Sequence, residues 1–128
     1  GEAMRLRELG YERWITEQLA MPATLTRPWL DSLVTNPSFS LNSGHRVDRW
    51  HAQAVYAPDQ LRQRMAFALS QIMVIADSGG INDRMVAEYQ DLLARNAFGT
   101  YRNLLQEVSL SPTMGQWLTW VRNRAAYA

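Results

Sequence analysis

The sequence predicts an all-α protein, in which five to seven helices pack around one long apolar helix at about residues 59–78. Three observations support this fold class. Apolar residues recur at steps of three and four residues, which is the spacing of a helix with one buried face. No alternating strand pattern extends beyond a few residues, and no internal repeat occurs. Of the 128 residues, 47% are hydrophobic, so the chain can form a globular core and is not expected to be disordered.

The first half of the chain is expected to hold three helices and one irregular connection. The helices are expected at residues 3–9, 11–20 and 43–56. Gly10 separates the first two, because glycine commonly ends helices. Residues 21–42 form an irregular, proline-rich connection with at most one turn of helix near residues 29–34.

The strongest helical pattern covers residues 59–78. Pro58 or Asp59 stands at its start, where a missing N–H or a carboxylate is favoured, and Gly79 and Gly80 end it. A helix of about 20 residues would be about 30 Å long. Apolar residues surround it almost completely, so other helices are expected to cover it on several sides. They include Leu61, Met65, Phe67, Ala68, Leu69, Ile72, Met73, Val74, Ile75 and Ala76.

The second half is expected to hold three more helices. They are expected at residues 82–98, at residues 101–110 and from residue 112 onward. Asn82 and Thr100 are suitable N-cap residues, and Gly99 ends the first of these helices. Ser111 followed by Pro112 is a cap followed by a first-turn proline.

Composition excludes several classes of site. The chain contains no cysteine, which excludes disulfides, thiolate zinc ligands and a cysteine nucleophile. All 13 basic residues are arginine, so no lysine nucleophile or phosphate-loop lysine is present. The net charge is +1 and the arginines are spread evenly among the 12 acidic residues, so nucleic acid is not an expected partner. No apolar run reaches the ~18 residues of a membrane span.

Arg62 and Arg64 are the first candidate ligand-binding residues. One of them could bind an anion or a ligand carboxylate. At a separation of two residues on a helix they point about 200° apart, so they cannot form one clamp. The alternative is structural pairing with acids of neighbouring helices, for example Asp91.

Glu88, Asp91 and Asn96 form a second candidate cluster on the helix at residues 82–98. Glu88 and Asp91 lie three residues apart and could share acid and base roles if they were buried together. Asp91 and Arg95 have the spacing of an ion pair on the helix surface. The alternative for Asn96 is closure of the helix end near Gly99.

Two further sets complete the candidates. His45, Asp48 and His51 spread over about 120° of a helix face and are weak candidates for a metal site, for which a polar solvated face is the alternative. We expect no metal and no cofactor. The aromatic residues expected to form an interaction surface are Trp117, Trp120 and Tyr127.

Three segments resemble a bacterial family called domain of unknown function 1800, in the family's own order. They are DQLRQRMAFALSQI at residues 59–72, DLLARNAFGTYRNLL at 91–105 and VSLSPTMGQWL at 108–118. Residues 9–19 fit the family's N-terminal helix pair. Ser111 stands where the family often has histidine, and Trp117 stands where tyrosine is common, so any chemistry of that histidine would be missing here.

The resemblance implies a mainly helical, often exported bacterial protein of several hundred residues, whose activity is not established. Residues 1–128 are then one helical domain or the N-terminal portion of a larger one, and neither end carries the signals of a natural terminus. We expect a structural or interaction portion whose partner is the remainder of its own chain, or a second copy bound through exposed apolar surface. The alternatives are the scaffold half of an enzyme, hydrolase-like, whose decisive residues lie downstream of Ala128, and a peptide- or partner-binding helical module. The expected localisation is periplasmic or extracellular.

Overall fold

The computed structural model describes residues 2–35, 39–77 and 80–120, and over these residues the protein contains helices and no strand. Its eight helices exceed the expected number by one, because the proline-rich connection contains a helix of seven residues where a single turn was predicted. The helices are α1 (Glu2–Leu9), α2 (Tyr11–Ala20), α3 (Arg27–Leu33), α4 (Ser43–Tyr56), α5 (Gln60–Ser70), α6 (Asp83–Arg95), α7 (Tyr101–Leu110) and α8 (Pro112–Trp117).

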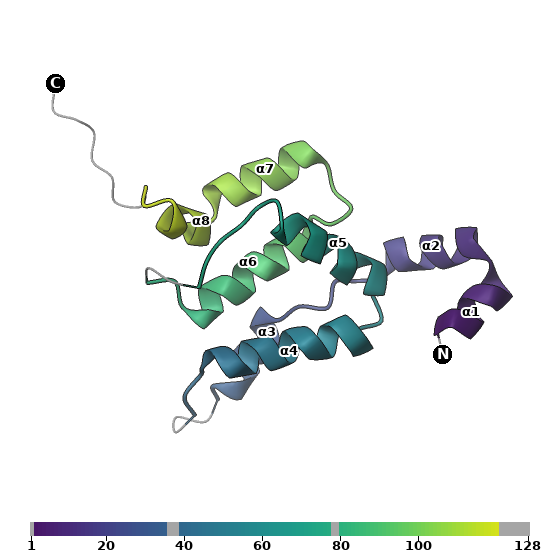
Figure 1. Cartoon of the computed structure of the whole chain (residues 1–128), viewed down its shortest axis with the longest axis horizontal. Coiled ribbons are helices and arrows are strands. Elements are labelled where there is room, and N and C mark those ends of the chain that lie inside the picture. Colours follow the sequence, from purple (N-terminus) through teal and green to yellow (C-terminus); the bar gives the residue numbers. More distant parts are fainter. Residues whose placement is uncertain (1, 36–38, 78–79, 121–128) are drawn as a thin grey trace, which may run out of the picture.

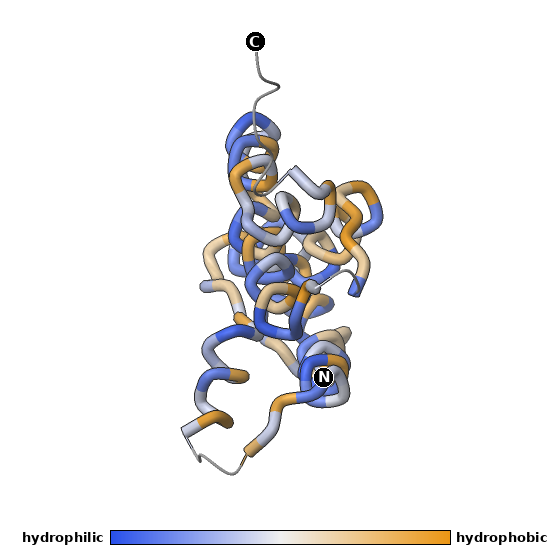
Figure 2. Tube along the Cα trace, turned by 90° about the vertical axis from the view of Figure 1, so that its left-hand side faces the viewer, coloured by the Kyte–Doolittle hydropathy of each residue, from blue (hydrophilic) through white to orange (hydrophobic). Residues whose placement is uncertain are grey.

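The helices are arranged around the pair formed by α5 and α6 (Figure 1). Helices α3 and α4 pack on one side of this pair, and α7 and α8 pack on α6 from the other side. Helices α1 and α2 form an arm that extends from the end of α5. Hydrophobic and hydrophilic stretches alternate along the trace, as expected of helices with one buried face (Figure 2).

Helix α6 is the most buried helix of the described structure. The side chain of Asn82 accepts a hydrogen bond from the backbone N–H of Met85 at 3.0 Å, which confirms the predicted N-cap. Thr100 caps α7 in the same way. Seven residues of α6 are buried, namely Val86, Ala87, Tyr89, Asp91, Leu92, Leu93 and Ala94. Four of them, Tyr89, Leu92, Leu93 and Ala94, form the core cluster with Ala66, Leu104, Val108 and Met114 from neighbouring helices.

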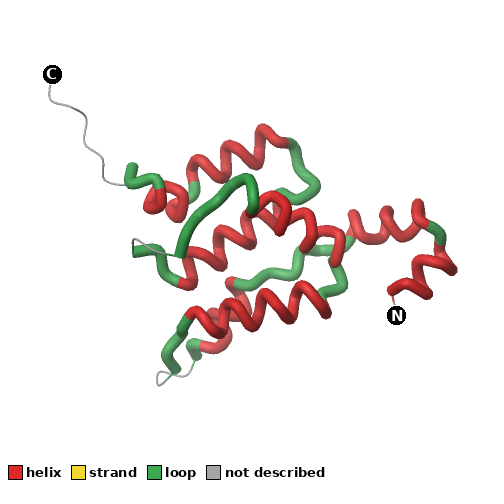
Figure 3. Tube along the Cα trace, in the orientation of Figure 1, coloured by secondary structure: helices red, strands yellow, loops and turns green. Residues whose placement is uncertain are grey.

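The long central helix predicted at residues 59–78 is not confirmed. Helix α5 ends at Ser70, and residues 71–77 form the connection to α6 that Figure 3 shows in green. Ala66 is the buried residue of α5, and Phe67 remains 50% exposed. The centre of the fold is therefore α6, and one side of the apolar helix α5 is open.

Contacts with α6 explain why the helix stops early. The hydroxyl of Tyr89 donates a hydrogen bond to the backbone carbonyl of Met73 at 2.9 Å. Met73 and Ile75 pack against the core cluster from this connection. A continued helix would carry both side chains away along its own axis, so burial against α6 outweighs the local helical pattern.

None of the helices in the described part of the chain is both long and apolar enough to span a membrane. From residues 71–77, Met73 and Ile75 pack against the core, whereas Ile72 and Val74 are largely exposed.

Candidate functional site

An extended segment around Thr24 and Thr26 lies among α4, α5 and α6, and two buried carboxylates hold it. Asp59 accepts hydrogen bonds from the backbone N–H of Thr24 at 2.9 Å and from its hydroxyl at 2.6 Å. Asp91 accepts hydrogen bonds from the backbone N–H groups of Thr26 at 2.7 Å and Arg27 at 2.8 Å. The second pair of bonds satisfies free N–H groups at the start of α3, where a negative charge is favourable.

Two glutamines complete this network. The amide of Gln53 donates to the carbonyl of Thr24 at 3.2 Å and accepts from the hydroxyl of Thr26 at 2.9 Å. The amide of Gln63 donates to the same carbonyl of Thr24 at 3.0 Å and to the carboxylate of Asp59 at 3.0 Å. Buried polar groups that find partners in this way stabilise one arrangement of the helices. The network therefore has a structural role.

Burial raises the pKa of Asp91 above its usual value, because it removes water from the carboxylate. The hydrogen bonds from the backbone of Thr26 and Arg27 and the charge of Arg95 act in the opposite direction. The neighbouring charge of Glu88 adds to the rise. Asp91 is 2% exposed, so the predicted surface ion pair with Arg95 does not form. Arg95 instead pairs with Glu88 at 2.8 Å.

Asn96 closes the end of α6, as the alternative reading of the sequence proposed. Its side-chain amide donates to the carbonyl of Leu92 at 3.0 Å and to the carboxylate of Glu107 at 2.8 Å. Glu88 lies on the exposed side of α6, with Arg27 at 3.9 Å as a second cation. The residues of this candidate cluster are thus not brought together around one space.

Arg62 bonds to backbone carbonyls rather than to an acid. Its guanidinium donates to the carbonyls of Ala94 and Met21, each at 3.1 Å, and lies 4.6 Å from the ring centroid of Phe98. It therefore joins the C-terminal ends of α2 and α6, where carbonyls lack helical partners and a cation is favourable.

Arg64 shares no hydrogen-bond partner with Arg62. It is exposed, and its guanidinium donates to the side-chain oxygen of Gln60 at 3.3 Å. Among the described residues it forms no ion pair. Its charge is therefore available for a ligand.

The histidine set does not converge. His45 belongs to the N-terminal cap of α4, where its Nδ1 accepts from the backbone N–H of Asn42 at 3.3 Å. His51 packs edge-on against Trp50 with ring centroids 5.0 Å apart, and Asp48 is exposed. No group of three or more histidine, aspartate or glutamate residues in the described parts of the chain is placed to hold a metal ion.

The predicted aromatic surface is divided. Trp117 packs partly against the core, whereas Trp120 is 43% exposed. Tyr127 lies outside the described residues. Leu110, which precedes α8 in the sequence, and Leu118, which follows it, are also largely exposed.

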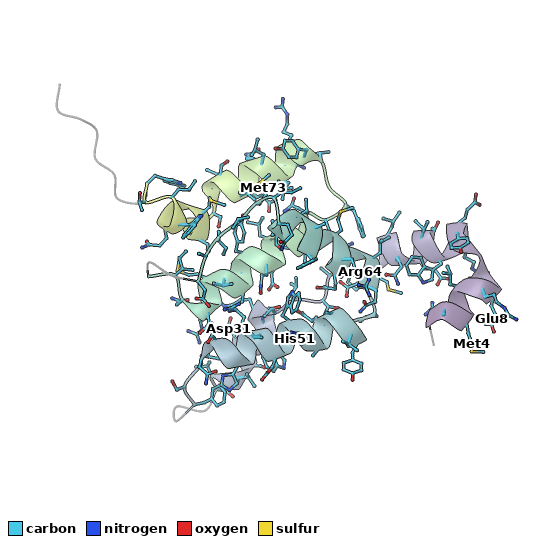
Figure 4. All side chains as sticks on the ribbon, in the orientation of Figure 1. Met4, Glu8, Asp31, His51, Arg64 and Met73 are labelled. Atoms are coloured by element: carbon cyan, nitrogen blue, oxygen red, sulfur yellow. The ribbon has the colours of Figure 1, made fainter. Side chains whose placement is uncertain are left out.

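The feature that sequence reasoning missed is a cavity between α4 and α5. It has a volume of about 180 Å³ and is lined by Trp50, Ala54, Gln60, Gln63, Arg64 and Phe67. The rings of Trp50 and Phe67 lie 5.9 Å apart and are tilted by 50°. Figure 4 labels Arg64 on α5 and His51 on the adjacent helix α4. The sequence pattern predicted that other helices cover the helix of Phe67 on several sides. The cavity was missed because α5 is in fact open on one side, where Phe67 is exposed.

A second cavity of about 40 Å³ adjoins the first and shares Trp50, Gln63 and Phe67 with it. Asp91 and Gln90 are among its other lining residues. The side-chain oxygen of Gln90 is buried and has no hydrogen-bond partner among the described residues. The polar network therefore forms the inner side of the α4–α5 region.

Comparison with known proteins identifies the family of this chain. The model of the family described as Protein of unknown function (DUF1800) matches residues 1–128. No curated protein and no solved structure matches the chain. The match covers the whole sequence and agrees with the resemblance of its three segments, so the chain belongs to the DUF1800 family of uncharacterised proteins.

Proposed function

We propose that this chain is a non-catalytic structural and interaction portion of a larger bacterial protein, and that it packs against the remainder of that protein through the surface around α8. The observation that carries the proposal is the exposure of three large hydrophobic side chains that precede and follow α8 in the sequence. Leu110 is 70% exposed, Leu118 is 58% exposed and Trp120 is 43% exposed. Covering one leucine side chain contributes about 2 kcal/mol, so three such groups favour a packed partner.

The candidate polar residues support the same proposal. Arg62, Asp91 and Asn96 are each engaged in hydrogen bonds that hold the helices together. An enzyme would instead need nucleophiles, acids or bases that converge on one space. No observation among the described residues favours the enzyme alternative.

The test compares the accessibility of two introduced thiols in the intact polypeptide. The 128 residues contain no cysteine, so Leu118→Cys places a single thiol in this region. Tyr56→Cys is the matched control, because Tyr56 is 83% exposed at the far end of α4. If α8 is covered, Leu118→Cys should react with a maleimide at least about tenfold more slowly than Tyr56→Cys, because labelling requires local opening.

Equal labelling rates would contradict the proposal. Protection of Leu118→Cys that appears only as the protein concentration rises would assign the covered surface to self-association, which is the second partner expected from the sequence. Urea-unfolded samples of both variants should label at the same rate and thus calibrate the comparison.

We also propose export from the cytoplasm, which the family resemblance alone supports. Fractionation of the source bacterium, with marker proteins for each compartment, tests this part. Recovery of the protein with the cytoplasmic markers would contradict it.

A further inference from the structure

We propose that the cavity between α4 and α5 binds a small aromatic carboxylate, with its ring packed against Trp50 and Phe67 and its carboxylate on Arg64. This site lies apart from the surface around α8 and does not depend on the proposed function. The inference rests on the size of the cavity, its aromatic walls and the single charge at its rim.

The size of the cavity fits one aromatic ring. Its volume is about 180 Å³. An apolar protein cavity of about 150 Å³ holds benzene, so a six-membered ring with a short substituent can be accommodated here.

The walls supply the contacts that a ring prefers. Trp50 and Phe67 contribute aromatic faces from opposite helices, and Ala54 leaves space beside Trp50. The two rings are tilted by 50°, so a third ring can stack on one of them and meet the other edge-on. Phe67 is 50% exposed on the open side of α5, and a bound ring would cover it.

The charge at the rim selects a carboxylate. Arg64 is the charged residue among those that line the cavity. Its guanidinium has one bond, of 3.3 Å, to the oxygen of Gln60, so its other donors can form a bidentate contact with a carboxylate. The amide nitrogens of Gln60 and Gln63 already donate to backbone carbonyls, to Ala57 at 2.8 Å and Thr24 at 3.0 Å. Arg64 is therefore the group that fixes the orientation of the ligand.

Three small probes separate the ring from the charge. Phenylacetate carries the aromatic ring and the negative charge. Phenylacetamide has the ring without the charge, and acetate has the charge without the ring. Their dissociation constants are measured for the intact protein by ligand-observed NMR. We expect phenylacetate to bind at least about tenfold more tightly than either of the other two, because a charge-assisted bidentate bond adds to ring burial.

Arg64→Gln should remove the preference for phenylacetate over phenylacetamide and leave the affinity for the amide unchanged. Arg102→Gln is the matched control, because Arg102 is an exposed arginine on α7 with no ion pair among the described residues. It should keep the preference. Phe67→Ala should weaken phenylacetate and phenylacetamide alike, and circular dichroism checks that each variant is folded.

Equal affinity of the wild-type protein for phenylacetate and phenylacetamide would overturn the inference, as would a preference that survives Arg64→Gln. Failure of phenylacetate to bind at its solubility limit would overturn it as well. None of these outcomes affects the thiol-labelling test around α8, so each of the two proposals can fail without the other.

Discussion

Asp91 Oδ1 accepts a hydrogen bond of 2.7 Å from the backbone N–H of Thr26, a residue 65 positions earlier in the chain. Its other oxygen accepts from Arg27, so one buried carboxylate on α6 fixes the start of α3. This arrangement predicts an unusual dependence of stability on pH.

Burial raises the pKa of Asp91 above its ordinary value of 3.8. Because the pKa is higher in the folded state, the stability that Asp91 contributes is fully present below about pH 3.8 and decreases as the pH rises through the folded pKa. We expect the unfolding free energy of the wild type, relative to Asp91→Asn, to decline over this window in urea titrations. Asp91→Asn should also lower the unfolding free energy by about 1–3 kcal/mol, because the amide nitrogen cannot accept a hydrogen bond and one N–H of α3 loses its acceptor.

Asp48→Asn is the control for this experiment, because Asp48 is exposed on α4. The difference in unfolding free energy between the wild type and Asp48→Asn should not decline over the same pH window. A wild-type advantage over Asp91→Asn that grows with rising pH would show that the hydrogen bonds from Thr26 and Arg27 outweigh desolvation.

Arg62 and Arg64 should differ in their effect on stability. Arg62→Gln loses hydrogen bonds to the carbonyls of Ala94 and Met21 and the contact with Phe98. We expect it to lower the unfolding free energy by about 2 kcal/mol, because hydrogen bonds of a charged donor are lost in a partly buried place. Arg64→Gln should change it by less than about 0.5 kcal/mol, because its side chain is exposed. Denaturant unfolding measures both, and similar losses would refute the structural role assigned to Arg62.

Tyr89 should ionise late in an alkaline titration. Burial raises its pKa to about 12 from 10.0, and its hydroxyl donates to the carbonyl of Met73. The corresponding stability is present below pH 10 and is lost as the pH rises through about 12. The absorbance of tyrosinate should therefore show a late step that is absent in Tyr89→Phe. The same variant should lose about 1 kcal/mol at neutral pH with its hydrogen bond. A wild-type titration without the late step would count against the burial of the Tyr89 hydroxyl.

Gln90 offers a stabilising substitution. Its buried side-chain oxygen has no partner among the described residues, which costs free energy in the folded state. Gln90→Met keeps a similar volume and removes the polar group, so we expect a gain of about 1 kcal/mol in denaturant unfolding. Gln106→Met, at an exposed position on α7, should give no such gain. A loss of stability in Gln90→Met would indicate a polar partner, such as a bound water, in the small cavity.

The starts of the helices in the second half of the chain were predicted well from the sequence. Asn82, Thr100 and Pro112 occupy the expected starting positions of α6, α7 and α8. Capping depends on residues within one turn, so a local pattern contains the necessary information. The end of α5 depends instead on Met73 and Ile75 packing on α6, which no local pattern contains.

The candidate site was less predictable for a related reason. Sequence reasoning found Arg62, Arg64 and Asp91 as residues of interest, but their partners lie far away along the chain. Asp91 binds the backbone of Thr26, and Arg62 binds carbonyls of α2 and α6. Every residue carries a backbone carbonyl, and nearly every residue carries a backbone N–H, so residue types in the sequence do not reveal which of these groups a side chain will bind. The cavity beside Phe67 arises because α4 covers only part of α5, which depends on how the helices pack.

The attachment of Thr24 and Thr26 also constrains how the chain can assemble during synthesis. The backbone N–H of Thr24 donates to Asp59, which lies 35 residues later in the chain. The backbone N–H of Thr26 donates to Asp91, which lies 65 residues later. Loops of this length must close before either bond forms, so these contacts belong to the late, slow steps of folding. A nascent chain whose Asp91 has not yet emerged from the ribosome lacks the carboxylate that accepts from Thr26 and Arg27, so the start of α3 cannot take its final position.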